Sequence, residues 1–132
     1  MSTIAPMIDP ERVANVQEAL KARGLDGWLF FDFRGQNPVA NAMVGLGWAT
    51  RRSFVLVPTE GEPVALIHAI EHSSWRHWPW AKRDYSGWRD MEVKLAELVA
   101  GRSRLAMEVS SRSSVPTLDR IPAGMLELFK EV

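Results

Sequence analysis

Residues 51–68 read Arg51-Arg52-Ser53-Phe54-Val55-Leu56-Val57-Pro58, Thr59-Glu60-Gly61-Glu62-Pro63 and Val64-Ala65-Leu66-Ile67-His68, and this stretch decides the fold. Two apolar runs of strand length, 54–57 and 64–67, enclose a short polar segment that contains Gly61. This pattern predicts a β-hairpin with a tight connection over residues 59–62. Before the hairpin, residues 32–50 contain Pro38 and several glycines and predict a loop, with a short helical turn over residues 39–44.

Upstream of the hairpin, the sequence predicts one amphipathic helix and one buried strand. Asp9-Pro10-Glu11 supplies a capping side chain, a residue suited to the first helical position and a charge suited to the positive end of the helix dipole. Apolar residues then recur at spacings of three and four over residues 13–20, and Gly24 marks the end of the helix. The run Trp28–Phe31 is continuously apolar, which is typical of a central strand buried on both faces.

Downstream of the hairpin, strands and helices continue to alternate. Residues 82–85 predict a short strand, a second amphipathic helix runs from Trp88 to near Gly101, and apolar residues at 125–129 predict a last helix. Residues 73–80, which are dense in tryptophan, receive no assignment. We therefore expect an α/β fold, a mixed sheet with a central hairpin and helices on its faces. Its strands are expected at Trp28–Phe31, Phe54–Val57, Val64–Ile67 and Leu105–Val109.

The composition is that of an ordinary globular domain. The chain has 132 residues, 46% of them hydrophobic and 24% charged, so a single domain is expected. Lys plus Arg and Asp plus Glu each number 16, so no net charge favours nucleic acid or an anionic membrane. The absence of cysteine excludes disulfides and thiolate chemistry. Without a leader pattern or an apolar run near the ~20 residues of a membrane span, we expect a cytoplasmic protein, with neither nucleic acid nor membrane as partner.

One five-residue motif, His68-Ala69-Ile70-Glu71-His72, fits the H-x-x-E-H pattern of certain zinc peptidases. In that pattern two histidines one helical turn apart bind zinc and the glutamate acts as base, and Glu127 or Glu131 could supply a third ligand. However, His68 directly follows a predicted strand, whereas the pattern needs a sustained helix. The favoured interpretation is that these polar residues close a strand and open a turn, and no metal site is predicted.

A second segment interleaves aromatic and basic side chains. It contains Trp75, Arg76, His77, Trp78, Trp80, Lys82 and Arg83. Such a segment could stack nucleic-acid bases or grip sugars. It could equally pack its indoles on the core or contact another protein, since Trp and Arg are enriched at interface hot spots. Because the net charge is balanced, packing or a protein contact is the preferred interpretation.

Several segments, taken in order, are similar to a known family. They begin with Leu20-Lys21-Ala22-Arg23-Gly24-Leu25-Asp26-Gly27, continue through 37–47 and the hairpin, and include Ala106-Met107-Glu108. Their order and spacing resemble the small N-terminal domain of the Xaa-Pro aminopeptidase, prolidase and creatinase family. Ala42 and Val44 depart from the usual loop pattern, in which an aromatic and a hydroxyl residue commonly precede the glycine.

The resemblance implies that residues 1–132 form a single non-catalytic N-terminal domain and that the C-terminal catalytic domain is absent from this chain. In relatives that domain has the pita-bread fold, and in the peptidases it holds two divalent metal ions, manganese, cobalt or zinc, through two Asp, one His and two Glu. A metal-bound water attacks the bond before proline, whereas creatinase uses the same scaffold without metal. No segment here matches those metal-binding motifs, so no catalytic or metal-binding residue is expected.

The resemblance also implies a homodimer in which the N-terminal domain of one subunit approaches the other subunit's active site. We expect self-association through the tryptophan-rich segment and residues 37–48. In the full-length dimer, Asn41, Trp48, Arg51 and Arg52 would contact the peptide substrate, because a guanidinium is a fork-shaped donor to carboxylates and an indole can cover a proline ring. Alternatively, the two arginines are solvated residues that open a strand, one on each face.

These expectations combine into one function. The chain is interpreted as the non-catalytic N-terminal domain of an Xaa-Pro peptidase. It would serve subunit association and cover the active site of the catalytic domain, which hydrolyses the bond before proline. The alternative is a free-standing interaction or regulatory module without enzymatic activity. A downstream coding region with the two-Asp, one-His, two-Glu set would separate the two.

Overall fold

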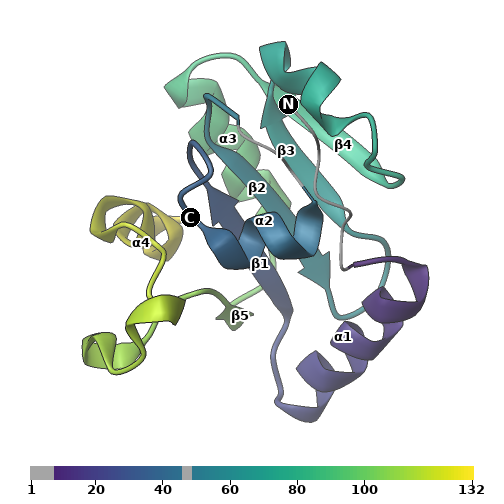
Figure 1. Cartoon of the computed structure of the whole chain (residues 1–132), viewed down its shortest axis with the longest axis vertical. Coiled ribbons are helices and arrows are strands. Elements are labelled where there is room, and N and C mark those ends of the chain that lie inside the picture. The colour runs from purple at the N-terminus through teal and green to yellow at the C-terminus, as the bar shows by residue number, and fades with distance from the viewer. Residues whose placement is uncertain (1–7, 46–48) are drawn as a thin grey trace.

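We describe the fold from a computed structural model of the chain, over residues 8–45 and 49–132 (Figure 1). The strands are β1 (Gly27–Asp32), β2 (Ser53–Pro58), β3 (Val64–His68), β4 (Ala81–Tyr85) and β5 (Leu105–Ala106). Within the described residues they form one mixed sheet in the order β4-β3-β2-β1-β5. Strand β2 is antiparallel to both β1 and β3, whereas β4 is parallel to β3 and β5 is parallel to β1.

Helices pack on both faces of this sheet (Figure 1). One face contacts α1 (Pro10–Ala22), α2 (Pro38–Val44) and the 3-10 helix η1 (Ala69–Trp75). The other face contacts α3 (Trp88–Val99) and α4 (Ala123–Glu131). Two further 3-10 turns, η2 (Ser111–Ser113) and η3 (Pro116–Leu118), connect β5 to α4. The domain is therefore a three-layer arrangement with the sheet in the middle.

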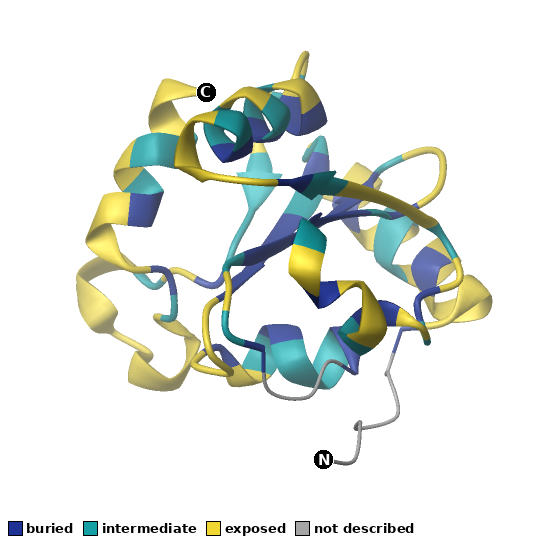
Figure 2. Cartoon of the chain, turned by 90° about the horizontal axis from the view of Figure 1, so that it is seen from above, coloured by how far each residue is buried: buried dark blue, intermediate teal, exposed yellow. Residues whose placement is uncertain are grey.

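Alternation along the strands divides the core into two clusters, one on each face of the sheet. The cluster facing α1, α2 and η1 includes Phe30, Val55, Val57, Ala65, Ile67, Trp75 and Trp78. The cluster facing α3 and α4 includes Leu29, Phe31, Phe54, Leu56, Leu66, Met91 and Leu95. Figure 2 shows the strands as a buried layer between helices whose outer surfaces are exposed. Burial on both faces explains why β1 and β2 read as continuous apolar runs.

The helix ends follow local capping chemistry. Asp9 caps α1 by accepting the backbone N–H three residues on at 2.8 Å, and Pro10 occupies the first helical position. Asn37 caps α2 in the same way at 3.3 Å, with Pro38 at the first position. At the other end of α2, Gly45 adopts the left-handed conformation with φ 73°, which a residue without a Cβ reaches at little cost. These signals fix where α2 begins and ends.

The predicted mixed α/β sheet with a central hairpin is confirmed. The strands expected at 28–31, 54–57 and 64–67 are present as β1, β2 and β3, and the short strand expected at 82–85 is β4. Gly61 supplies the tight connection of the hairpin with φ 96°. Strand β1 is buried and lies between β2 and β5, as its apolar run indicated.

The strand predicted over Leu105–Val109 is wrong beyond residue 106. Strand β5 pairs with β1 only through Gly27 with Leu105 and Trp28 with Ala106. Further along, the carbonyl of Glu108 accepts the backbone N–H of Arg120 at 2.8 Å rather than a neighbouring strand. The apolar pattern of residues 105–109 could not show where the strand ends. The chain leaves the sheet where Glu108 contacts Arg120, a residue later in the sequence.

The tryptophan-rich segment turns its first two indoles into the core. Trp75 is 1% exposed and Trp78 is 5% exposed, so the packing interpretation is confirmed for both. Trp80 is partly buried against the same cluster, whereas Trp88 is 57% exposed. Trp48 lies outside the described residues. Self-association through this segment stays a prediction. The indoles of Trp75 and Trp78 are buried in the domain core and are not free to contact a second subunit.

Candidate functional site

Polar side chains gather where β1 ends and α2 begins. Asp32, the last residue of β1, is paired in register with Ser53, the first residue of β2. Asn37 caps α2, and Asn41 lies one turn into that helix. Glu108 reaches the same place from 71 positions along the chain. All of these residues are buried except Asn41, which is half-buried.

The Asp32 carboxylate holds the turn between β1 and α2. Its Oδ1 accepts the backbone N–H of Asn37 at 2.8 Å and the Nδ2 group of Asn41 at 3.2 Å. Its Oδ2 accepts the backbone N–H of Gly35 at 2.9 Å. Burial raises the pKa of Asp32, and the hydrogen bonds from Asn37, Gly35 and Asn41 act in the opposite direction. The side chain therefore orders the turn that leads into α2.

Asn37 is the centre of the network. Its Nδ2 group donates to the carbonyl of Phe31 and to Oε1 of Glu108, both at 2.7 Å. Its Oδ1 atom accepts the backbone N–H of Ala40. An asparagine side chain offers two donor hydrogens and one oxygen, so each of its polar atoms has a partner here. One residue thus joins β1, α2 and the segment after β5.

Glu108 completes the network from the other side. Its Oε2 accepts the indole Nε1–H of Trp28 at 2.7 Å, while its Oε1 accepts from Asn37. Burial raises the pKa of Glu108, and these two hydrogen bonds lower it by a smaller amount. No ion pair to Glu108 occurs among the described residues, so two neutral donors stabilise its carboxylate.

This arrangement is suited to architecture rather than to catalysis. The carboxylate oxygens of Asp32 and Glu108 are all occupied by protein donors, and both residues are buried. Neither carboxylate is placed to act as a base toward a molecule in solvent. What the network does is fix the start of α2 against β1.

Three of the four residues expected to contact a substrate lie in the described part of the chain, and Asn41 lies on a different element from Arg51 and Arg52. Asn41 turns its Nδ2 group inward, to Asp32 and to the carbonyl of Asn37 at 2.9 Å. Trp48 lies outside the described residues. Arg51 and Arg52 lie just before β2. Within the described part of the chain, no hydrogen bond or ion pair joins Asn41 to either arginine.

The backbone before β2 is held by Glu71. Its Oε1 atom accepts the backbone N–H groups of Thr50 and Arg51 and the hydroxyl of Thr50, each at 3.0 Å. Arg51 is exposed, and its guanidinium donates to the Thr50 hydroxyl at 3.2 Å. A buried carboxylate from η1 therefore positions the residues that lead into the strand.

Arg52 is half-buried beside an open groove. Its carbonyl accepts the Tyr85 hydroxyl at 2.6 Å, and burial raises the pKa of Tyr85 to about 12, so the hydroxyl stays protonated as a donor. The groove is also lined by Phe33, by Glu92 of α3 and by Met125 and Glu127 of α4. Among the described candidates, Arg52 is thus the residue that lines this groove.

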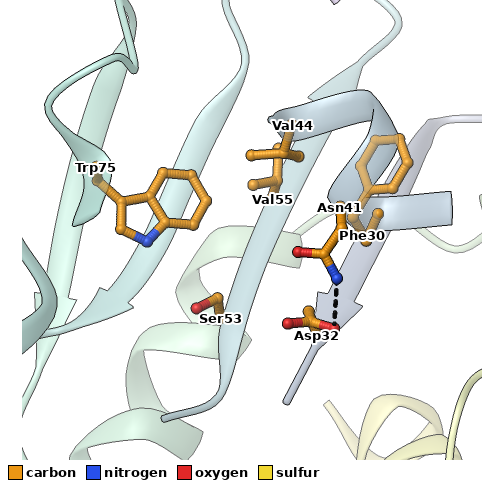
Figure 3. A pocket seen from close by; sticks show the side chains of 8 residues that line it. Phe30, Asp32, Asn41, Val44, Ser53, Val55 and Trp75 are labelled. Atoms are coloured by element: carbon orange, nitrogen blue, oxygen red, sulfur yellow. Dashed lines mark hydrogen bonds between the residues drawn. The ribbon is translucent and has the colours of Figure 1, made fainter. Parts of the chain in front are cut away.

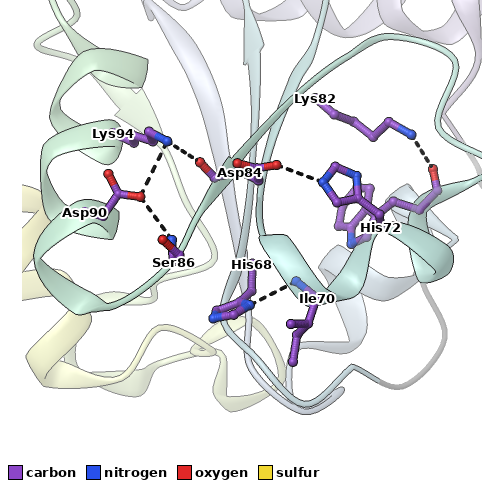
Figure 4. A network of polar contacts seen from close by, with 9 residues as sticks. His68, Ile70, His72, Lys82, Asp84, Ser86, Asp90 and Lys94 are labelled. Atoms are coloured by element: carbon purple, nitrogen blue, oxygen red, sulfur yellow. Dashed lines mark hydrogen bonds and ion pairs between the residues drawn. The ribbon is translucent and has the colours of Figure 1, made fainter.

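The H-x-x-E-H motif does not assemble as a zinc site (Figure 4). His68 ends β3, and its Nδ1 accepts the backbone N–H of Ile70 at 3.1 Å. His72 pairs with Asp84 at 2.8 Å, and Glu71 points to the backbone before β2. The three side chains therefore have three separate sets of partners. Among residues 8–45 and 49–132, no group of three or more His, Cys, Asp or Glu side chains could hold a metal ion.

Sequence reasoning missed the residues that organise this end of the sheet. Asp32, Asn37, Glu71 and Glu108 were not identified as a polar network, although Asn37-Pro38 is a recognisable helix start. Their contacts span up to 80 positions, so no short motif could reveal them. The buried carboxylates carry no local signal that distinguishes them from the other acidic residues.

Comparison with known proteins gives matches by structure. No family model and no curated protein matches the sequence. A proline dipeptidase structure from Streptococcus agalactiae matches with a TM-score of 0.70 and 14% identity, over 94% of this chain and 88% of that one. A creatinase/prolidase N-terminal domain of an X-Pro dipeptidase from Streptococcus pyogenes matches with a TM-score of 0.70 and 13% identity, again over 94% and 88%.

Part of a longer chain has a similar fold. A prolidase from Pyrococcus horikoshii matches with a TM-score of 0.65 and 16% identity over 92% of this chain, which spans only 29% of the prolidase. No described helix combines the length and the apolar character that crossing a membrane would require. The described part of this chain therefore has the fold of the creatinase/prolidase N-terminal domain.

Proposed function

We propose that this chain is the non-catalytic N-terminal domain of an Xaa-Pro peptidase, where it serves subunit association and covers the active site of a linked catalytic domain. The observation that supports this proposal is the pattern of coverage. The chain covers 88% of a streptococcal proline dipeptidase structure and 88% of a streptococcal X-Pro dipeptidase N-terminal domain, but only 29% of a prolidase chain. In the full-length protein, the remaining two thirds would carry the chemistry.

The metal ions of such an enzyme would bind outside this chain. The described residues do not fit a dimetal centre, because they contain no group of three or more possible ligands. The three buried carboxyls, Asp32, Glu71 and Glu108, are already engaged by protein donors. We therefore assign manganese, cobalt or zinc to the linked catalytic domain alone, and derive no step through a metal here.

Arg52 is the described residue best placed to serve a neighbouring active site. Its backbone is fixed by Tyr85, while its half-buried side chain borders the groove beside α4. A guanidinium in that position can donate to the carboxylate or carbonyls of a short peptide. Arg51 is more exposed and is the weaker candidate of the pair, and Asn41 is committed to Asp32. Trp48 remains a candidate cover for the proline ring.

The first test asks where the activity lies. The chain alone, supplied with manganese or cobalt, should not hydrolyse Xaa-Pro dipeptides. A polypeptide in which it is joined to the catalytic domain encoded with it should do so. Hydrolysis by the isolated chain would contradict the proposal. If no catalytic domain with two Asp, one His and two Glu is encoded with it, the free-standing interaction module becomes the better reading.

The second test asks whether Arg52 acts on the substrate. In the full-length enzyme, Arg52→Ala should raise KM for short Xaa-Pro peptides and lower kcat/KM about tenfold, as loss of a charge-assisted hydrogen bond does. The Tyr85 bond goes to the backbone carbonyl of residue 52, so the fold should remain intact.

Arg23→Ala is the matched control, because this exposed arginine lies near the opposite end of the β1–β2 pair, where Gly27 faces Pro58. Its kinetics should not change. Equal, unchanged kinetics in both variants would assign the residues before β2 to architecture alone.

A further inference from the structure

We propose that a buried site between α2, β2 and η1 binds one water molecule as a fixed part of the domain. Three buried polar atoms without a protein hydrogen-bond partner lie in the described part of the chain: Oδ1 of Asn41, Oγ of Ser53 and Nε1 of Trp75. All three residues line the same small cavity (Figure 3). They come from three different elements, so their convergence is a feature of the tertiary fold.

The floor of the cavity follows from the strand register. Asp32 faces Ser53 and Phe30 faces Val55 across the β1–β2 pair, and these four residues line the side toward α2. Strand alternation directs Asp32 and Ser53 to the same face as Phe30 and Val55. On this face of the sheet, the last pair, Asp32 with Ser53, is polar, whereas the pair two residues earlier, Phe30 with Val55, has apolar side chains. Residues of α2 and the ring of Trp75 complete the wall.

The size of the cavity suits one water molecule. About 10 Å³ is open to the centre of a water-sized sphere. A buried water needs roughly 10–15 Å³ by this measure and two to four polar partners. Ser53 is 4% exposed and Trp75 is 1% exposed, so two of the three partners are shielded from bulk solvent. A larger solute would not fit.

The hydrogen-bonding chemistry selects a molecule that both donates and accepts. Asn41 donates through Nδ2 to Asp32 and to the carbonyl of Asn37, which fixes Oδ1 as the atom that faces the cavity. Oδ1 can only accept, the indole Nε1–H of Trp75 can only donate, and the Ser53 hydroxyl can do either. Ammonium could not accept from the indole, and a halide could not donate to the amide oxygen. Water satisfies all three groups.

The bound water would join elements that few other polar contacts connect. It would accept a hydrogen bond from Trp75 of η1 and donate one to Asn41 of α2. A third hydrogen bond would join it to the hydroxyl of Ser53 in β2, with either group as the donor. Leaving a buried polar group unpaired costs about 1–3 kcal/mol, so three such groups facing one cavity favour occupancy. The inference is independent of the proposed peptidase role, because it concerns only residues inside this domain.

The test is water-selective nuclear magnetic resonance on the full chain with 15N-labelled tryptophan. The indole signals of Trp75 and Trp78 are assigned from Trp75→Phe and Trp78→Phe. Trp78 is the matched control, because it is similarly buried but its Nε1–H donates to the carbonyl of Ala81 at 3.0 Å. We expect a direct cross-relaxation peak between water and the Trp75 indole proton, and none for Trp78.

Magnetisation could also reach Trp75 through the exchanging Ser53 hydroxyl. The peak should therefore be recorded again in Ser53→Ala, where we expect it to persist, because the water keeps Asn41 and Trp75 as partners. A Trp75 indole that behaves like Trp78, or a peak lost in Ser53→Ala, would overturn the proposal. A crystal structure in which the three atoms hydrogen-bond to other protein groups would also overturn it.

Discussion

Two polar regions of this domain differ in how sequence relates to structure. In the H-x-x-E-H segment, three ionisable residues lie within five positions, yet His68, Glu71 and His72 have separate partners. In the network at the end of β1, Asn37 and Glu108 are 71 positions apart and form a 2.7 Å hydrogen bond. In the first region, residues that are close in sequence do not form a common site. In the second region, residues that are far apart in sequence are in direct contact.

The two regions also differ in burial, and this sets the energetic scale of each. His72 and Asp84 retain about half of their side-chain exposure, at 52% and 45%. Exposed pairs of this kind contribute about 0–1 kcal/mol, because water competes for both charges. Asn37 and Glu108 are 1% and 5% exposed, so an unpaired group there would keep its full desolvation cost. The comparison therefore predicts large effects in the network and small ones in the motif.

The largest effect is expected from Asn37→Ala. This change removes the α2 cap and the donors to Phe31 and Glu108, and it should lower the free energy of unfolding by about 3 kcal/mol. Urea denaturation followed by tryptophan fluorescence measures it. Asn15→Ala, an exposed change within α1, is the control and should alter stability by less than about 0.5 kcal/mol. Similar losses in the two variants would refute a special role for Asn37.

The next effect is expected from Glu108→Gln. Both carboxylate oxygens accept hydrogen bonds, from Trp28 and Asn37, so a glutamine must turn its NH₂ group toward one of these donors. We expect a loss of about 2 kcal/mol in the free energy of unfolding. Glu97→Gln on the exposed side of α3 is the matched control and should be near neutral. A Glu108→Gln variant as stable as wild type would show that the carboxylate is not needed.

The pH dependence of this difference provides a finer test. Burial raises the pKa of Glu108 above its ordinary value of 4.5, so the folded state binds a proton at a pH where the unfolded state does not. The stability contribution of Glu108 is therefore present in full below pH 4.5 and is lost as the pH rises through the raised pKa. The deficit of Glu108→Gln relative to wild type should grow as the pH falls from 7 toward 4.5. A deficit that shrinks over this range would mean that the folded state favours the ionised carboxylate.

The smallest effect is expected from His72→Ala. The backbone carbonyl of its partner Asp84 accepts a hydrogen bond from Lys94 Nζ at 2.7 Å, so the end of β4 keeps another contact when the histidine is removed (Figure 4). We expect a change of about 0.5 kcal/mol or less in the free energy of unfolding. Zinc titration of the wild-type chain should show no stoichiometric binding that adds stability. One tightly bound zinc per chain would restore the catalytic reading of the motif.

The sequence was sufficient for most of the fold because its signals are local. Asp9-Pro10 marks the start of α1, the apolar runs mark β1 to β3, and Gly61 marks the hairpin turn. The end of β5 was missed because Glu108 reads as one more residue of an alternating strand, whereas its carboxylate binds Asn37 and Trp28. Capping and periodicity are visible within a few neighbouring residues of the sequence. A buried hydrogen bond between distant residues leaves no such local pattern.

The site was less predictable for the same reason. Arg51 and Arg52 lie directly before β2, as the local sequence pattern predicted. Glu71, which holds the backbone at 50–51, was recognised only as part of the H-x-x-E-H motif. Asn41 donates its Nδ2 group to Asp32, and its expected contact with a substrate in the full-length dimer stays a prediction. Its orientation depends on a carboxylate nine positions earlier in the chain, which no pattern in the helix itself reveals.

We expect Asn37 and Glu108 to act as one unit, although they are far apart in the sequence. A double-mutant cycle with Asn37→Ala, Glu108→Ala and the double variant measures this coupling, with unfolding free energies from urea denaturation. We expect a coupling energy of about 1–3 kcal/mol, with the double variant less destabilised than the sum of the single variants. Effects that add to within about 0.5 kcal/mol would contradict it, because two independent sites behave in that way.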